Sequence, residues 1–299
     1  MYRFRIDRSL TLRLADPFKR TFKNSHSRRI PVLMYHGINS VLRSGHPYFE
    51  TNTSASTFAR HMQHLHDGGY RPMKLSTAIA MIDSGTWPHR AVVITFDDGF
   101  RDFYTHAMPI LQEYRFPATM FIVSSFMGSR TSRFGHKDFM TWGETREVES
   151  FGVEIGSHTV SHPHLHSLHR QNIEKELKDS KDAIEDQLGR PISSFSYPYA
   201  FPEQDGAFVK KLRHDMKIAG YDHGVTTVLG SANRRSDRYF LPRLPANEYD
   251  DDQLFQAKLD GSYDWLRTPQ LIYKVARGRR RIDIFSQERD PKSKLAAEL

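Results

Sequence analysis

The chain has 299 residues, a length that fits one large α/β domain or two small ones, and its 38% hydrophobic content is enough for a substantial core. It contains no cysteine, which excludes disulfide bonds and thiolate metal sites. No run reaches the ~18 apolar residues that cross a bilayer and the first residues lack the apolar core of a secretory signal, so we expect a cytoplasmic protein, at most peripheral to the inner membrane face.

The formal net charge of +8 is concentrated at the two ends of the chain. Residues 1–30 carry a net +7 and residues 274–299 a net +4, which leaves −3 for the part between them. We therefore expect a basic N-terminal extension over 1–29, a catalytic domain over 30–273 and a basic tail over 274–299. Basic ends are more often solvated than bound to a polyanion, and we expect no nucleic-acid partner.

Hydrophobic residues recur every four positions between basic residues near the N-terminus, at Leu10, Leu14, Phe18 and Phe22. That spacing allows a short amphipathic helix. The helix would either lie on a membrane surface, as a peripheral contact of the basic N-terminus, or pack on the domain. The sequence leaves both arrangements open.

Strand-like and helix-like segments alternate after residue 30, and repeated β-then-α units indicate a parallel sheet or barrel. In chain order, we expect strand 31–35, helices 56–65 and 76–82, strand 91–96, helix 102–114, strands 118–123 and 153–156, helix 171–188, strand 193–197, helix 205–219, strands 223–228 and 239–243, and a helix after residue 250.

Polar motifs follow directly after four of these strands. In a parallel barrel the carboxyl ends of the strands share one face, where active sites are built, so we expect the motifs to converge there. They are His36, the pair Asp97 and Asp98, the pair His158 and His162, and Pro198 with Tyr199. Other histidines lack such a placement and are expected on the surface; they are His61, His64, His66, His164, His166 and His169.

Asp97 and Asp98 are adjacent carboxylates at the tip of a buried strand, and like charges so close raise each other's pKa. A metal ion beside them removes that cost. His158 and His162 supply matching imidazoles, from one helical turn or from a compact loop. Asp98 with the two histidines suits a divalent ion that acts as a Lewis acid, with Zn²⁺ preferred and Co²⁺ or Ni²⁺ as alternatives.

This assignment leaves Asp97 as the candidate general base, with capping of the following helix as its structural alternative. His36 follows an apolar strand and precedes a glycine turn. It is a candidate general acid, and the same placement also fits a core histidine whose two nitrogens are hydrogen-bonded.

Three segments resemble a known family. Residues 95–99 (TFDDG) resemble the first motif of the NodB-type polysaccharide deacetylases, carbohydrate esterase family four. Residues 157–162 (SHTVSH) match the second motif, and residues 195–200 (FSYPYA) resemble the third. The resemblance spans about 31–245. It implies a distorted (β/α) barrel of about seven strands and metal-dependent removal of N-acetyl groups from acetamido sugars.

The chain departs from the common pattern in its third motif and in its order. Ser196 stands where many members place an arginine that orients the base, and Ala200 replaces a glycine. No Leu-x-His motif follows; instead residues 32–36 (VLMYH) precede the first motif, which resembles the permuted branch that contains poly-N-acetylglucosamine deacetylases. That branch takes its acid from an N-terminal strand, which favours His36. Arg243 is our candidate for the missing guanidinium, unless it forms an ordinary ion pair.

The resemblance implies that Asp97 activates water, that His36 protonates the leaving amine, and that the metal ion and the backbone N–H of Tyr199 hold the oxyanion. Pro198 and Tyr199 would contact the substrate, an N-acetylated saccharide. Trp142 either stacks on a sugar ring or fills the core. Two alternatives stay open: an O-acetyl esterase acting on a glycan, and a catalytically inactive carbohydrate-binding relative. The sequence does not specify the sugar, its linkage or the oligomeric state.

Overall fold

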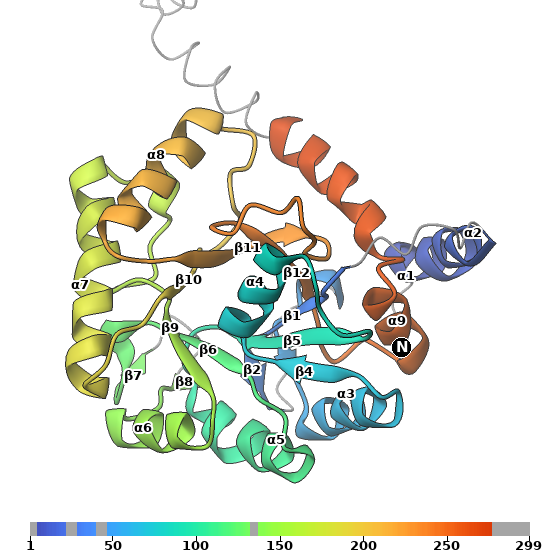
Figure 1. Ribbon diagram of the computed structural model, residues 1–299, viewed down its shortest axis with the longest axis horizontal. Helices are drawn as coiled ribbons and strands as arrows, with labels where there is room; N and C mark the ends of the chain where they lie inside the picture. The colour runs from blue at the N-terminus through green and yellow to red at the C-terminus, as the bar shows by residue number, and fades with distance from the viewer. Residues whose placement is uncertain (1–4, 22–28, 40–46, 132–136, 277–299) are drawn as a thin grey trace, which may run out of the picture.

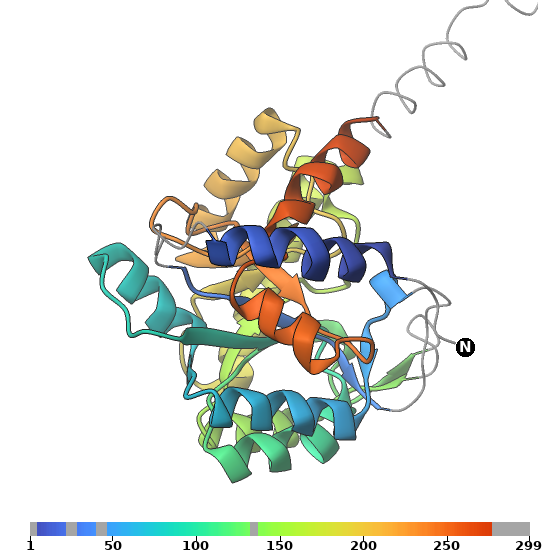
Figure 2. The same ribbon diagram turned by 90° about the vertical axis from the view of Figure 1, so that its right-hand side faces the viewer.

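The computed structural model describes residues 5–21, 29–39, 47–131 and 137–276 (Figures 1 and 2). Its centre is a closed barrel of 7 parallel strands, in which β1 pairs with β12 on one edge and with β5 on the other. The barrel strands are β1 (Val32–Tyr35), β5 (Ala91–Phe96), β6 (Thr119–Ile122), β9 (Glu154–Ser157), β10 (Ser194–Ser196), β11 (His223–Leu229) and β12 (Leu241–Pro245). The predicted (β/α) barrel is confirmed.

An additional strand distorts the barrel. β4 (Arg71–Met73) pairs with the first half of β5, and β6 pairs with the second half of the same edge, because β1 occupies the opposite edge. β4 therefore lies beside the barrel and outside its closed ring. It was not predicted, because it is three residues long and includes Pro72, which is unfavourable within a strand.

Helices surround the barrel on its outer side (Figure 1). They are α3 (Ala55–Asp67), α5 (Met108–Tyr114), α6 (Trp142–Ser150), α7 (Arg170–Leu188), α8 (Gly206–Ile218) and α9 (Asp252–Leu259), with the π-helical η3 (Phe103–Ala107) leading into α5. Apolar faces such as Phe58, Met62 and Leu65 of α3 are completely buried against the outside of the barrel. Every predicted strand and helix is present, with bounds shifted by at most two residues.

The remaining helix of this set, α4 (Leu75–Ser84), closes one end of the barrel. Leu75 and Ile79 join a cluster with Val93 and Phe121, whose side chains fill the barrel interior. The backbone N–H of Leu75 also donates to Thr119 Oγ1, at the first residue of β6, at 3.1 Å. The amino end of the barrel is thus sealed, and the carboxyl end is left for the polar motifs.

Two short strand pairs lie at the carboxyl end of the barrel. Neither was predicted, because strands of two residues give no periodic signal. They are β2 (Gly37–Ile38) with β3 (Asn52–Thr53), and β7 (Arg130–Thr131) with β8 (Lys137–Asp138).

The predicted N-terminal helix is confirmed over α1 (Ile6–Leu10), the π-helical η1 (Thr11–Ala15) and α2 (Asp16–Thr21). We call this continuous element the N-terminal helix. Its packing on the domain is described below; Phe22 and residues 277–299 of the basic tail lie outside the described residues. In the part of the chain that the structure describes, no helix is both long enough and apolar enough to cross a membrane.

Candidate active site

The polar motifs converge at the carboxyl end of the barrel, as their positions after the strands predicted. Asp97 and Asp98 directly follow β5, and His158 directly follows β9. His162 lies four residues farther along the same loop, so the two imidazoles come from a compact loop and not from a helix. All four side chains are buried, with residue exposures of 2% to 5%.

Asp98, His158 and His162 form a cluster that could hold a metal ion, because one ligand atom from each lies within 4.8 Å of the others. His158 Nε2 is 3.6 Å from Asp98 Oδ1, and His162 Nε2 is 3.4 Å from the same oxygen. The two imidazoles approach each other edge to face, with ring centroids 4.8 Å apart.

The chemistry of this donor set fits a divalent ion. His158 Nδ1 lies 2.7 Å from the carbonyl oxygen of Ser196, so it must donate its proton there, which leaves the lone pair on the Nε2 that faces Asp98. Burial lowers the pKa of His158, and this keeps the ring neutral, as a metal ligand must be. Two imidazole nitrogens and one carboxylate oxygen suit Zn²⁺ and similar ions.

The backbone of these motifs is unusual. Asp98, Thr159, His162 and Tyr199 have positive φ angles of 79°, 73°, 53° and 57°. Residues other than glycine rarely adopt this left-handed conformation, and such positions concentrate at functional sites. The chain therefore accepts local strain in the loops that carry the ligands.

Glu176 holds the histidine loop in place. Its Oε2 accepts hydrogen bonds from the backbone N–H groups of Val160 and Ser161 at 2.8 and 2.9 Å, and its Oε1 accepts one from Ser161 Oγ at 2.6 Å. Nothing in the sequence alone marks Glu176 as part of the site. It sits in the middle of α7, and only the tertiary structure places that turn of helix beside the loop between the two histidines.

Asp97 is held by Arg243, which reaches it from β12. The guanidinium Nη1 donates to Asp97 Oδ1 at 2.8 Å and Nη2 donates to Oδ2 at 2.7 Å, a two-point ion pair. Arg243 is 0% exposed and its Nε donates to the carbonyl of Thr226 at 3.0 Å. Burial by itself would raise the pKa of Asp97, but the positive charge of Arg243 holds that pKa well below its usual range.

Ser196 explains how Arg243 fits. The small side chain leaves room for the guanidinium, and Arg243 Nη2 donates to Ser196 Oγ at 3.1 Å while Ser196 Oγ donates to Asp97 Oδ1 at 3.2 Å. A serine in the third motif and an arginine on β12 thus occupy one space together. The structure brings Arg243 to Asp97, as the sequence suggested.

His36 lies at the edge of this group. Its Nε2 is 3.9 Å from Asp97 Oδ2, and its side chain is 21% exposed. Loss of hydration lowers the pKa of His36 to about 4, the charge of Arg243 adds to the shift, and Asp97 opposes it. The resting imidazole is therefore neutral near pH 7.

Pro198 and Tyr199 follow β10 and line the same region. The ring of Tyr199 packs edge to face on His162, with centroids 4.4 Å apart, and stacks on His164 at 3.8 Å. His164 is exposed, as expected from the sequence, but its stacking on Tyr199 was not foreseen. No described residue accepts a hydrogen bond from the backbone N–H of Tyr199.

Trp142 lies apart from this cluster. It is the first residue of α6 and packs, partly buried, against the core between the barrel and its helices. Its side chain makes no hydrogen bond or ring contact with another described residue, and its contact with a sugar stays a prediction.

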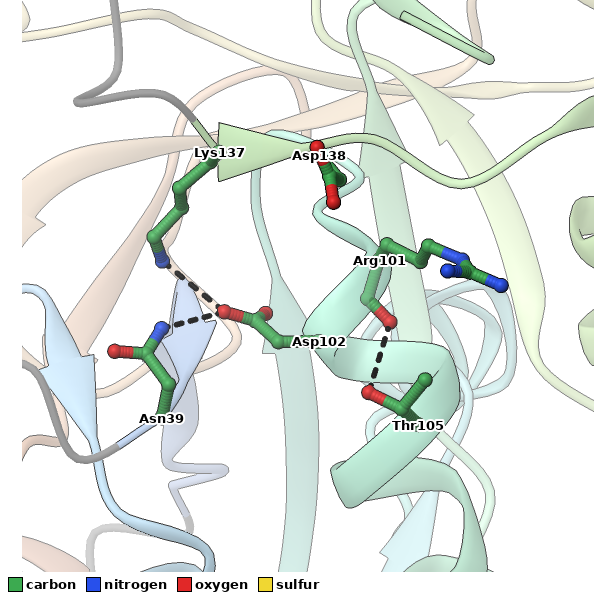
Figure 3. Close-up of a pocket in the computed structure, with 6 residues that line it drawn as sticks. All are labelled: Asn39, Arg101, Asp102, Thr105, Lys137 and Asp138. Atoms are coloured by element: carbon green, nitrogen blue, oxygen red, sulfur yellow. Dashed lines mark hydrogen bonds and ion pairs between the residues drawn. The ribbon is translucent and has the colours of Figure 1, made fainter. Parts of the chain in front are cut away.

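A polar pocket of about 220 Å³ lies at the same end of the barrel (Figure 3). Asp102 Oδ2 is its centre, accepting hydrogen bonds from Asn39 Nδ2 at 2.6 Å and from Lys137 Nζ at 3.1 Å. Lys137 crosses directly over Gly37, the neighbour of His36, where an added Cβ would meet Nζ at 1.9 Å. None of these residues was predicted at the site, because their spacing follows no recognisable motif.

One expectation was wrong. His61 is completely buried and lies in the core. Its Nδ1 is 2.9 Å from Tyr35 Oη, its Nε2 is 3.0 Å from the carbonyl of Asp250, and its ring stacks on Phe255 with centroids 4.1 Å apart. α3 turns His61 toward the core, and two polar partners replace the water that it loses.

Comparisons with known proteins agree with this arrangement. The sequence profile of a family described as polysaccharide deacetylase matches residues 84–222, which include Asp97 and the three candidate metal ligands but not His36 or Arg243. YxkH of Bacillus subtilis, a protein assigned to the polysaccharide deacetylases, is 32% identical over 223 residues, or 74% of this chain and 73% of that protein. The poly-beta-1,6-N-acetyl-D-glucosamine N-deacetylase of Staphylococcus aureus is 27% identical over 199 residues, or 64% of this chain and 67% of the relative.

Solved structures show the same fold. The deacetylase PplD of Streptococcus pyogenes, in complex with acetate, matches with a TM-score of 0.66 and 25% identity over 77% of this chain and 98% of that one. IcaB from Ammonifex degensii matches with a TM-score of 0.64 and 20% identity over 79% of this chain and 97% of that one. YxkH is 32% identical to this chain and is matched over 73% of its own length, and the barrel and its motifs are in place. The chain therefore belongs to the polysaccharide deacetylase family.

Proposed function

We propose that this protein is a metal-dependent hydrolase that removes N-acetyl groups from the acetamido sugars of a polysaccharide or a saccharide intermediate. The observation that carries the proposal is the juxtaposition of two groups at the barrel mouth. One is the cluster of Asp98, His158 and His162, and the other is Asp97, which is ion-paired with Arg243. A metal-binding set beside an unprotonated carboxylate supplies what amide hydrolysis by water requires.

The first group would hold the ion. Asp98 and the Nε2 atoms of the two histidines are its proposed ligands, with Zn²⁺ the preferred ion and Co²⁺ or Ni²⁺ the alternatives. Such an ion, when bound, polarises an acyl oxygen and makes water more acidic. The hydrogen bonds of His158 to Ser196 and of Glu176 to the loop keep the ligands oriented.

Asp97 would act as the general base. Its lowered pKa keeps it ionised at neutral pH, and Arg243 fixes the plane of its carboxylate. It would take a proton from the attacking water as the carbon–oxygen bond forms. A base with so low a pKa is weak, and its contribution comes from position more than from proton affinity.

His36 would deliver a proton to the leaving nitrogen. Since its pKa is about 4, the resting ring carries no charge at neutral pH and must gain its proton during the reaction. Asp97, once protonated, is the nearby source, with its Oδ2 only 3.9 Å from His36 Nε2. The proton removed from water would thus pass to the amine as the carbon–nitrogen bond breaks, giving acetate and a free amino sugar.

The oxyanion and the sugar would be held by backbone and pocket groups. The N–H of Tyr199 has no acceptor among the described residues and can donate to the developing oxyanion. The amide, ammonium and carboxylate groups of the pocket in Figure 3 match the hydrogen-bonding capacity of sugar hydroxyls, and we expect the saccharide to extend over it. Stacking by Trp142 remains part of this proposal.

An amine leaves only when protonated, so the presence of His36 favours an N-acetyl over an O-acetyl substrate. The name of the staphylococcal relative, a poly-beta-1,6-N-acetyl-D-glucosamine N-deacetylase, points to the same substrate class.

The test is acetate release from β-1,6-linked N-acetylglucosamine oligomers, with acetylxylan assayed in parallel. We expect turnover of the oligomers, loss of turnover after chelation, and recovery on adding Zn²⁺ or Co²⁺. Activity confined to acetylxylan would favour an ester substrate. Tight saccharide binding without turnover at any metal would favour an inactive binding protein.

A further inference from the structure

The N-terminal helix is fastened to the protein through its polar side. Among the hydrogen bonds that secure it, Tyr263 Oη donates to Asp7 Oδ2 at 2.6 Å, Trp265 Nε1 to Thr11 Oγ1 at 3.0 Å, and Ser262 Oγ to Asp16 Oδ1 at 3.0 Å. Thr11 and Asp16 are buried in this contact. An ordinary surface helix does the opposite, covering the core with its apolar face and showing its polar face to water.

The apolar side of this helix consequently faces outward. Ile6, Leu10, Leu14 and Phe18, which we call the apolar stripe, are 64%, 38%, 63% and 66% exposed. Only four other large hydrophobic residues are comparably exposed in the described part of the chain. The wider π-helical turn of η1 helps to keep residues four apart on one side, and the stripe runs for roughly 18 Å along the helix axis.

Positive charge accompanies the stripe. Arg13 is exposed beside Leu14, and residues 1–30 as a whole carry a net +7 while residues 31–273 carry −3. An exposed apolar face within a basic segment is the pattern of a helix that lies in the plane of a membrane surface.

We propose that the apolar stripe docks this protein on the surface of an anionic phospholipid bilayer. The side chains enter the boundary between headgroups and acyl chains, and the exposed Arg13 contacts lipid phosphates, whereas Arg5 and Arg8 stay paired with Asp250 and Asp251. A second copy of the chain fits less well. A symmetric contact would set two basic segments against each other, and four side chains offer far less than the roughly 800 Å² per partner of a stable interface.

The position of the helix gives this docking a direction. Its first turn is tied to the loop after β12 by Arg5, whose Nη1 lies 3.2 Å from Asp250 Oδ1, at the barrel end that carries the site. From there it runs along the flank of the barrel (Figure 2). The barrel would therefore rest on its side, with the site opening along the membrane surface. This proposal does not depend on the reaction proposed above.

The test is co-sedimentation of the full chain with vesicles of phosphatidylcholine, alone or mixed with phosphatidylglycerol. We expect binding to the anionic vesicles that weakens as salt rises. The double substitution Leu10→Gln with Leu14→Gln should lower the binding at least about ten-fold. Arg13→Gln should lower it by roughly five-fold. Ile218→Gln is the matched control, because Ile218 is 71% exposed on α8, across the molecule, and should have no effect.

Unchanged thermal midpoints would show that the variants are folded. The proposal is wrong if the wild-type chain ignores anionic vesicles, or if the double variant binds them as the wild type does. It is also wrong if sedimentation velocity shows that the wild type is a dimer and the double variant a monomer, since the stripe would then form an interface between two copies.

Discussion

Two buried carboxylates of this barrel are each neutralised by a buried cation, yet their surroundings differ. Asp97 receives both terminal nitrogens of Arg243, and the side chain of Arg243 is 0% exposed. Asp250, in the loop between β12 and α9, lies 2.6 Å from Lys258 Nζ and 3.2 Å from Arg5 Nη1. Burying a charge is costly in both places, and pairing is what makes it tolerable.

The difference lies in what else each carboxylate faces. Asp97 stands beside His36 and the candidate metal ligands, at the open end of the barrel. Asp250 is enclosed by main chain and by ionic partners that join α9, the N-terminal helix and the loop after β12. A buried ion pair alone therefore does not identify a site; its neighbours distinguish a group poised for chemistry from one that fastens segments together.

Replacing Asp97 should have the largest effect on activity. We expect Asp97→Asn to slow acetate release by roughly 10²–10⁴-fold, because the amide cannot accept the proton of the attacking water. Arg243 also loses its buried counter-charge, so turnover is compared per folded molecule, with the folded fraction measured at the assay temperature. Near-normal turnover at saturating metal would exclude Asp97 as the base.

Replacing Asp250 should act on stability. Asp250→Asn leaves Lys258 without its buried counter-charge, while Arg5 keeps Asp7 as a partner, and we expect the free energy of unfolding to fall by roughly 3–5 kcal/mol in urea denaturation. Turnover per folded molecule should stay close to that of the wild type. An equal loss of turnover would show that the two pairs are not distinct in function.

The pH dependence sharpens this prediction. Lys258 and Arg5 oppose the effect of burial and lower the pKa of Asp250 in the folded protein. The stabilisation is complete above the unfolded-state pKa of about 3.9 and is lost as the pH falls toward the lower folded-state value. The difference in unfolding free energy between the wild type and Asp250→Asn should therefore shrink below about pH 4.

The geometry of the Arg243 pair should matter as well as its charge. Arg243→Lys keeps one positive charge but cannot hold both oxygens of Asp97, nor reach Thr226 and Ser196 at once. We expect turnover to fall by up to about 10²-fold with little change in metal affinity, measured by metal titration and acetate release on the same sample. A lysine variant with full activity would reduce Arg243 to a neutralising charge.

Loosening the histidine loop should give the smallest of these effects. Glu176→Gln turns one acceptor oxygen into a donor that faces backbone N–H groups, and we expect metal affinity to weaken by roughly 10-fold to 100-fold in calorimetric titration. Glu174→Gln on the same helix is the control, because Glu174 is paired with Arg170 in an exposed i,i+4 position. Equal affinities in the two variants would remove Glu176 from the metal site.

Local sequence patterns predicted much of the fold. Apolar runs located every strand of the barrel ring, and helical periodicity located the helices around it. Neighbouring residues determine both the preferred secondary structure and the side of an element that is buried. The two-residue strands and β4 were not predicted, since they are too short to show a period. The two-residue strands pair with one another, and β4 pairs with the longer β5.

The candidate site was likewise predicted in part from the sequence. The residue types and spacing of the Asp97–Asp98 and His158–His162 motifs were enough to expect a metal cluster, because each pair is close in sequence. The contact of Glu176 with the histidine loop was invisible, since an acidic residue on a helix is usually solvated.

The sequence by itself determined the barrel class, the family and the side chains that can bind a metal ion, because these depend on short-range pattern. Only the tertiary structure decided that Arg243 meets Asp97 across 146 residues, that His61 turns inward, and that the N-terminal helix shows its apolar side to solvent. These outcomes depend on which distant surfaces meet when the chain closes, and hydrogen-bond partners far apart in sequence leave no periodic trace in it.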